Sequence, residues 1–177
     1  MSDVDDGTLV RRSVDGDDGA FEVLVQRYQT RIFNAVLRIV RDYDDARDVT
    51  QSVFVKAFEK LDSFDRRYKF FSWIYRMTVN DSLNTLKRRK PTEGLENESD
   101  IRTPVAAPDH AVELQDRVGK ALMCLRPDDR AVVVLKHFVS FSYKEIADVL
   151  EIPVRTVKSR LFTARERLRD ALLEGER

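Results

Sequence analysis

The sequence predicts an all-α protein of two small helical domains joined by a flexible acidic linker. Apolar residues recur every three or four positions over most of the 177 residues, which is the period of an amphipathic helix. Glycine occurs only six times, and β-branched runs are short, so strands are disfavoured. Residues 91–109 contain three prolines and no periodic apolar face, as expected of a linker. The predicted domains are therefore residues 1–90 and 110–177.

The first domain is expected to contain three long helices. They run from about Ala20 to Val40, from near Asp44 to Leu61, and from about Phe71 to Arg89. Asp17 or Asp18 can cap the first of them. The stripe predicted to be buried on the second comprises Ala46, Val49, Val53, Phe54, Ala57, Phe58 and Leu61. The three stripes can cover one another in one small bundle.

The second domain is expected to contain four shorter helices, at about 110–125, 127–139, 142–150 and 153–173. Ser142 and Glu145 have the spacing of a capping box, which marks the start of a helix. Pro153 suits the first turn of a helix but not its interior, so a break is expected just before it. A short helix, a tight turn and a second helix with early basic residues are typical of a helix-turn-helix.

Charge is distributed unevenly along the chain, although the 31 basic and 31 acidic residues give a formal net charge of zero. Residues 63–90 hold eight basic and two acidic residues, a net charge of +6. Residues 91–118 hold seven acidic and two basic residues, a net charge of −5. Residues 153–169 hold six basic and one acidic residue, a net charge of +5. Two anion-binding surfaces with an acidic connector are predicted, rather than a uniformly basic protein.

The cysteine content and the N-terminus bear on location. Cys124 is the only cysteine, so an intrachain disulfide and a cysteine-rich zinc site are excluded. Its apolar neighbours favour a position in the core. The acidic N-terminus does not resemble a signal peptide, and no apolar run approaches the roughly 20 residues that span a bilayer. A cytoplasmic protein with no membrane insertion, metal or cofactor is expected.

The last predicted helix has one polar and one apolar side. Its apolar side comprises Val157, Leu161, Ala164 and Leu168. Arg155, Lys158 and Arg160 on the polar side are suited to base edges in the major groove. Thr156 and Ser159 are suited to phosphates. The alternative is an ordinary helical hairpin with a solvated basic face. The capping box, the break just before Pro153 and the basic residues at the start of the last helix together favour DNA binding.

Aromatic and basic residues alternate in the segment FDRRYKFFSWIYRMTVN, residues 64–80. Single-stranded nucleic acid is bound by this combination, because rings stack on bases, at about 1–3 kcal/mol per base, while cations follow the phosphates. The alternative is that these side chains belong to the core, which is expected in part for Trp73, Ile74 and Met77. Residues 64–69 precede the helix and are expected to form an exposed loop.

Three stretches resemble one protein family, in the family's order. The family is the extracytoplasmic-function (ECF) group of bacterial RNA polymerase sigma factors. The stretch DARDVTQSVFVKAF (45–58) resembles the helix with which these factors bind core polymerase. The stretch FSWIYRMTVN (71–80) resembles the promoter-binding stretch that follows it. The segment from Leu125 to Leu172 resembles the C-terminal domain of that group nearly end to end. The resemblance covers about residues 18–90 and 110–173.

The resemblance implies a subunit that performs no chemistry itself. It would bind the β and β′ subunits of core RNA polymerase, read the −35 and −10 promoter elements and help to melt the −10 region. The linker would thread into the polymerase, and an anti-sigma protein is an implied partner. The implied polymerase-binding residues are Asp45, Asp48, Gln51 and Phe54. The implied −10 residues are Phe64, Asp65, Arg66, Arg67, Phe71, Trp73, Arg76, Asn80, Asn84, Lys87 and Arg88, with the basic end continuing to Lys90. The implied −35 residues are Val154, Arg155, Thr156, Lys158, Ser159 and Arg160.

Four positions depart from the family pattern. Arg47 and Ser52 stand where acidic residues are common, so a less acidic polymerase-facing surface is expected. Glu151 replaces a frequent glycine, and a left-handed backbone there would strain it. Arg155 replaces another frequent glycine, which either changes the −35 preference or strengthens phosphate contact.

Two other functions compete with this interpretation. A stand-alone operator-binding regulator would use only the helix-turn-helix and would leave the aromatic and basic first domain unexplained. An enzyme could use Asp44, Asp45 and Asp48 as a metal-binding cluster. Acidic residues in a first helical turn are better explained by the helix dipole.

Overall fold

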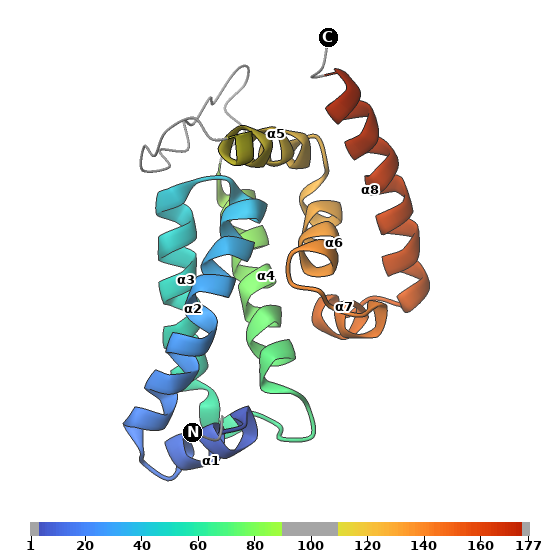
Figure 1. Ribbon diagram of the computed structural model, residues 1–177. Helices are drawn as coiled ribbons and strands as arrows, with labels where there is room; N and C mark the ends of the chain where they lie inside the picture. Colours follow the sequence, from blue (N-terminus) through green and yellow to red (C-terminus); the bar gives the residue numbers. More distant parts are fainter. Residues whose placement is uncertain (1–3, 90–109, 175–177) are drawn as a thin grey trace.

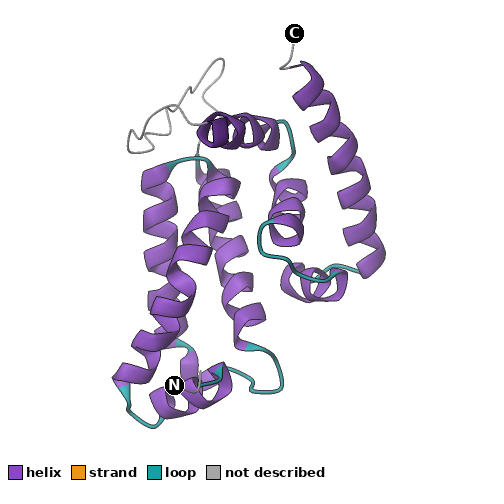
Figure 2. Cartoon of the chain, viewed as in Figure 1, coloured by secondary structure: helices purple, strands orange, loops and turns teal. Residues whose placement is uncertain are grey.

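The computed structural model describes residues 4–89 and 110–174, and every regular element in these ranges is helical (Figures 1 and 2). In chain order the elements are α1 (Asp6–Val14), α2 (Asp18–Val40), α3 (Tyr43–Glu59), a 3₁₀ turn η1 (Leu61–Ser63), α4 (Phe70–Arg88), α5 (His110–Met123), α6 (Pro127–His137), α7 (Tyr143–Leu150) and α8 (Val154–Glu174). The all-α prediction is confirmed, and α2 to α8 match the seven predicted helices. The predicted linker and Lys90 lie outside the described residues.

In the first domain, α2, α3 and α4 run side by side and α1 crosses one end of the bundle (Figure 1). The facing stripes meet as predicted: Leu24 and Ile32 of α2, Val53 of α3 and Ile74 of α4 are fully buried. Each such side chain contributes about 1.5–3 kcal/mol when it is removed from water. The bundle therefore presents its outward faces on rigid helices.

Aspartates begin three helices of this domain. Asp5 accepts from the amide of Thr8 at 3.0 Å, and Asp17 accepts from the amide of Ala20 at 3.3 Å. Asp42 does the same for α3. Each carboxylate satisfies a backbone donor that has no partner inside the helix. Of the two caps predicted for α2, Asp17 is the one used.

Helix α1 was not predicted from the sequence. It buries Leu9 and Val10, and Asp6 accepts hydrogen bonds from the Tyr28 hydroxyl and the Arg27 guanidinium on α2. Two apolar residues are too short a stripe to show helical periodicity. The helix is stabilised by this polar contact with α2, which depends on tertiary structure.

Two predicted core positions are wrong. Cys124 is exposed, because α5 ends at Met123 and the turn buries Leu122 and Leu125 instead. Phe58 remains 52% exposed at the end of α3, where its ring forms an edge-to-face pair with that of Phe21, with centroids 5.1 Å apart. Each lies within two residues of a helix end, where the face that points inward is set by packing and not by period alone.

In the second domain, α6, α7 and α8 pack around Leu135, Ile146, Val157 and Leu161. Helix α8 lies on the outside of this group, and α5 lies across the end of the first-domain bundle (Figure 1). The buried positions of α8 follow the predicted apolar side. The opposite side of α8 is therefore left for contacts outside the domain.

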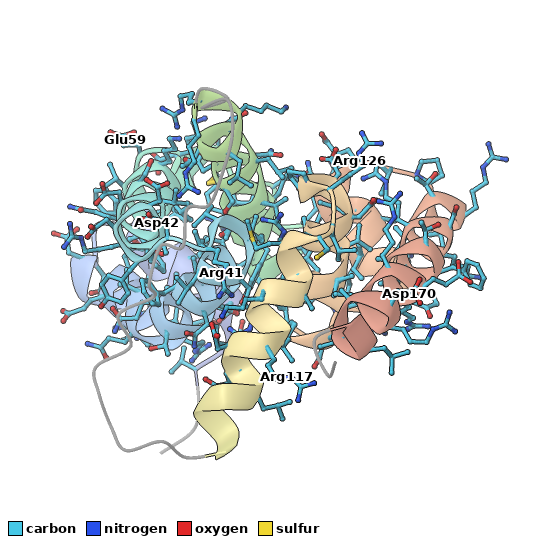
Figure 3. The ribbon with its side chains drawn as sticks, turned by 90° about the horizontal axis from the view of Figure 1, so that it is seen from above. Arg41, Asp42, Glu59, Arg117, Arg126 and Asp170 are labelled. Atoms are coloured by element: carbon cyan, nitrogen blue, oxygen red, sulfur yellow. The ribbon has the colours of Figure 1, made fainter. Side chains whose placement is uncertain are left out.

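The two domains are packed against each other. Arg41, where α2 ends, lies beside α5 (Figure 3), and its guanidinium contacts Asp116 at 2.8 Å. Gly119 leaves room for this contact, because a Cβ there would lie 1.9 Å from the Arg41 guanidinium. Arg130 on α6 is 3% exposed and donates to the carbonyl of Ile39 on α2. A buried charged donor thus links the domains.

Candidate nucleic-acid interfaces

The helix-turn-helix has the predicted local structure. The Ser142 hydroxyl accepts from the Glu145 amide at 3.2 Å, and the Ser142 amide donates to the Glu145 carboxylate at 2.9 Å. These reciprocal bonds begin α7, and the amide of Ser142 is the main reason that the pKa of Glu145 is lowered. Glu151 ends α7 in the left-handed conformation at φ 55°. The capping box and the break before α8 are both confirmed.

The first turns of α8 present a basic surface. Val154, Arg155, Lys158 and Ser159 are exposed, while Thr156 is half-buried. The remaining predicted cation, Arg160, is partly buried and its Nε lies 3.9 Å from the Asp129 carboxylate on α6. The exposed group is therefore smaller than predicted, and Arg160 also contributes to packing within the domain.

The loop between η1 and α4 is held in place by an aromatic cluster. The Phe64 ring lies 5.0 Å from that of Trp73 and 6.0 Å from that of Phe70, and only 8% of Phe64 is exposed. Tyr68, in the same loop, is 64% exposed. The prediction of an exposed loop is therefore correct for Tyr68 and wrong for Phe64. Tyr68 lies inside the segment that the resemblance implies for base capture, residues 64–71, but it was not singled out as a site residue.

Charges within this loop partly neutralise one another. The Asp65 carboxylate accepts from the backbone amide of Arg67 at 3.0 Å and from its guanidinium at 2.6 Å. These bonds, led by the guanidinium, lower the pKa of Asp65. Arg66 is exposed, and no hydrogen bond or ion pair joins it to the rest of the described chain. Arg66 is thus the loop cation most available for a phosphate.

A pocket of about 300 Å³ lies where the loop meets the start of α1. Phe64, Tyr68 and Phe71 line it together with Arg66 and Lys69. Rings and cations around one hollow are what an unstacked base and its phosphate require. Phe70, and Asp5, Asp6 and Gly7 at the start of α1, complete the lining.

The second half of α4 carries an exposed polar stripe. Asn80, Asn84 and Lys87 are exposed at positions spaced by four and three, which places them on one side of the helix. Arg88 is also exposed and bonds the carbonyl of Asn84 at 3.4 Å. Arg89 differs, because it pairs with Asp45. The predicted residues Asn80, Asn84, Lys87 and Arg88 therefore form one exposed surface on the second half of α4.

Phe71 and Arg76 lie where α4 meets α7 of the other domain. The Phe71 ring lies 5.1 Å from that of Phe141. The Arg76 guanidinium lies 3.0 Å from the Glu151 carboxylate and donates to the carbonyl of Asp148 at 2.6 Å. Both residues were predicted to bind the −10 element, and their contact with the second domain was not predicted.

Comparison of the sequence with known proteins identifies the family. Residues 24–92 match the model of Sigma-70 region 2, and residues 115–168 match the model of Sigma-70, region 4. The RNA polymerase sigma-H factor of Pseudomonas aeruginosa is 34% identical over 94% of this chain and 93% of its own length. The ECF RNA polymerase sigma-E factor of Escherichia coli K12 is 36% identical over 91% of both chains. This chain belongs to the ECF sigma factors. It therefore acts in transcription initiation, by directing RNA polymerase to promoters.

Solved structures of other sigma factors share the arrangement of both domains. CnrH, in complex with the cytosolic domain of CnrY, is 29% identical and superposes with a TM-score of 0.76 over 97% of this chain and 99% of its own. The sigma factor RpoE of Bartonella quintana, in complex with the anti-sigma factor NepR, gives 0.71 at 26% identity over 89% of this chain and 98% of its own. Such scores over nearly the whole chain require both domains to superpose together.

The outer face of α3 in this sigma factor is partly apolar. Asp48, Gln51, Val55 and Glu59 line a shallow hollow, and Val55 is 51% exposed. Among the predicted polymerase-binding residues, Asp48 and Gln51 lie on this face. Asp45 is instead paired with Arg89, and Phe54 is half-buried against the core.

The departures from the family pattern on α3 also have structural consequences. Arg47 lies 3.5 Å from the Asp44 carboxylate and 3.6 Å from that of Asp48. The acidic start of α3 is therefore partly neutralised, as predicted. Ser52 lies 3.4 Å from the Asp81 carboxylate on α4 and contributes to packing between the helices.

Two negative findings apply to the part of the chain that the structure describes. No group of three or more His, Cys, Asp or Glu side chains within it is arranged to hold a metal ion. None of its helices is long and apolar enough to cross a membrane.

Proposed function

We propose that the two domains of this sigma factor divide promoter recognition between them. Residues 1–90 would bind core polymerase and the −10 element, and residues 110–177 would read the −35 element. The observation that carries this proposal is the pairing of two exposed cationic surfaces, on the loop with α4 and on the start of α8, with a separate, mostly polar face on α3 that exposes Val55 and Phe58. The chemistry of RNA synthesis remains with the core enzyme, so the chain acts where polymerase acts, in the cytoplasm.

Each surface has residues suited to its proposed partner. On α3, Asp48, Gln51 and Val55 would contact the β′ and β subunits; the exposed Phe58 extends this face. Tyr68 and Arg66 would hold an unstacked base and its phosphate, and the predicted Asp65 and Arg67 would shape the loop. Trp73 would hold the loop in place through its ring contact with Phe64. The polar stripe of α4, comprising Asn80, Asn84, Lys87 and Arg88, would follow the adjacent duplex.

The second domain would place α8 in the major groove. Arg155 and Lys158 would face base edges, and Ser159 with Thr156 would bond phosphates. Val154 would contribute an apolar contact beside them. An anti-sigma protein is a proposed further partner, supported by the superposition with RpoE of Bartonella quintana in its complex with NepR.

The first experiment combines the purified chain with core RNA polymerase and separates the mixture by size exclusion. A stable complex is expected, and permanganate should then reveal unpaired thymines near −10 on a promoter library. Specific binding to duplex DNA without polymerase, and no complex with the core enzyme, would instead favour the stand-alone regulator.

Replacing Arg155 with alanine is expected to weaken binding of the holoenzyme to its promoter about tenfold and to relax preference at one −35 base pair, because Arg155 is exposed in the first turn of α8. Binding measured on a set of single-base −35 variants tests this. Arg167→Ala, an exposed change farther along α8, is the control and should leave the preference intact. A uniform loss on all sequences would assign Arg155 to a phosphate.

A further inference from the structure

The loop pocket is lined by carboxylates as well as by rings and cations. It is the hollow of about 300 Å³ between the loop before α4 and the start of α1 (Figure 1). Arg66 and Lys69 come from the loop, whereas Asp5 and Asp6 come from the start of α1. Stacking and phosphate binding use only the rings and the cations, and they leave the role of the carboxylates open.

The Asp5 carboxylate has acceptor capacity beyond its role as a helix cap. One oxygen accepts from the Thr8 amide at 3.0 Å and the other from the Thr8 hydroxyl at 2.7 Å. The hydroxyl, followed by the amide, lowers the pKa of Asp5, so the group is ionised at neutral pH. An ionised carboxylate can accept about four hydrogen bonds. Asp17 and Asp42 cap α2 and α3 in the same way, but of these three aspartates only Asp5 lines the pocket.

The start of α1 is held firmly in place beside the pocket. Asp6 accepts from the Arg27 guanidinium and from the Tyr28 hydroxyl, both on α2. The Tyr28 ring in turn lies 5.7 Å from that of Phe70, which lines the pocket. Asp5 precedes this anchored residue directly, so its carboxylate is presented by a fixed backbone.

The charges around the pocket give a bound nucleotide one orientation. The cations of the loop attract a phosphate and the carboxylates of α1 repel it. The phosphate therefore lies toward Arg66 and Lys69, and the edge of the base lies toward Asp5. A carboxylate only accepts hydrogen bonds, so it favours an amino group on that edge and disfavours a carbonyl oxygen. Adenine, cytosine and guanine carry an exocyclic amino group, whereas thymine carries carbonyl oxygens and a methyl group.

We propose that Asp5 selects the base captured in the loop pocket by accepting a hydrogen bond from an exocyclic amino group. Adenine, cytosine or guanine is therefore held more tightly than thymine at this position of the −10 element. The role of Asp5 rests on the proposed capture of an unpaired −10 base by Tyr68 and Arg66. It places a determinant of promoter preference on α1, outside the loop and outside α4.

The test uses full-length variants that keep the cap of α1. Asp5→Asn keeps an oxygen for the Thr8 amide, because asparagine caps helices about as well as aspartate, and it turns the second acceptor into a donor. Asp5→Ser also caps the helix and removes the second oxygen. Asp17→Asn is the matched control, since it makes the same change in the cap of α2, away from the pocket lining.

The probes are fork-junction promoters whose non-template −10 strand is unpaired, bound by each variant in complex with core RNA polymerase. An abasic site is first moved along this strand. The captured position is the one at which the abasic site weakens binding by the wild type but not by Tyr68→Ala. At that position adenine, cytosine and guanine are each compared with the analogue that lacks only the amino group, namely purine, pyrimidin-2-one and hypoxanthine.

Wild-type holoenzyme should bind the preferred base about five- to tenfold more tightly than its analogue, and thymine should bind most weakly of the four natural bases. Asp17→Asn should retain this ratio. Both Asp5 variants should bring the ratio close to one, because the acceptor for the amino group is gone. Asp5→Asn should also strengthen binding of thymine, since its amide can donate to a carbonyl oxygen.

The outcomes separate base selection from base capture. A wild-type ratio near one, or a ratio that both Asp5 variants leave unchanged, would overturn selection by Asp5 while the effect of the abasic site keeps capture intact. If the abasic site weakens binding at no position in a manner that depends on Tyr68, the proposed capture itself is wrong, and the role of Asp5 is overturned with it.

Discussion

Replacing Arg130 with methionine is expected to lower the free energy of unfolding by about 2–4 kcal/mol. The guanidinium donates to the carbonyls of Leu122 at 2.9 Å and Leu125 at 3.1 Å, and to that of Ile39 in the other domain. Methionine would remove all three bonds and leave the Leu122 carbonyl with only the Leu125 amide, at 3.2 Å. Burial of the cation is unfavourable and lowers the pKa of Arg130 to about 10. Removal of this buried charge therefore offsets part of the loss. The net change is therefore smaller than three unmade bonds.

Urea unfolding measures this change, with Arg126→Met as its control. Arg126 is exposed just before α6, so its replacement should stay within about 0.5 kcal/mol of the wild type. The free energy of unfolding of Arg130→Lys should fall between those of the two methionine variants. The compact ammonium lacks the planar fork of the guanidinium and cannot reach three separate carbonyls. If Arg130→Met unfolds at the wild-type urea concentration, the carbonyls have found other partners and Arg130 does not link the domains.

Local signals explain why most of the fold could be predicted. The stripes of α2 to α4, the cap at Asp17 and the capping box of α7 depend on residues within one or two turns. Arg130 shows the limit of such signals. In the sequence it is one more basic residue in a helix that begins with two acids, and its burial depends on Ile39, far away along the chain. The contact between the domains was missed for the same reason.

The candidate site stays a prediction, and the structure shows which of its side chains are exposed. Alternating rings and cations predicted a nucleic-acid surface on the loop and α4, but the pattern does not say which ring faces water. Phe64 turns inward because Phe70 and Trp73 offer it apolar surface, and this leaves Tyr68 outside. In the same way, charge alone did not reveal that Arg67 is paired within the loop.

Replacing Tyr68 with alanine is expected to weaken capture of the unpaired −10 strand by about 1–3 kcal/mol, or about 5- to 150-fold, if one base stacks on its ring. The ring is 64% exposed and lines the loop pocket beside Arg66, so it is positioned for a base without any change in the core. The free energy of unfolding should be nearly unchanged, because the Tyr68 ring is mostly exposed and its removal loses little buried apolar surface.

Tyr68→Phe separates stacking from hydrogen bonding, since it keeps the ring and removes only the hydroxyl. Permanganate reactivity of the −10 thymines in the holoenzyme complex measures opening, and protection of the −35 element measures initial binding. Alanine should reduce opening far more than initial binding, and phenylalanine should leave both near wild type. Equal loss with phenylalanine would assign the effect to the hydroxyl, and normal opening with alanine would show that no base stacks on this ring. The loop would then act through Arg66 and its charge alone, and opening would fall steeply with added salt in both variants.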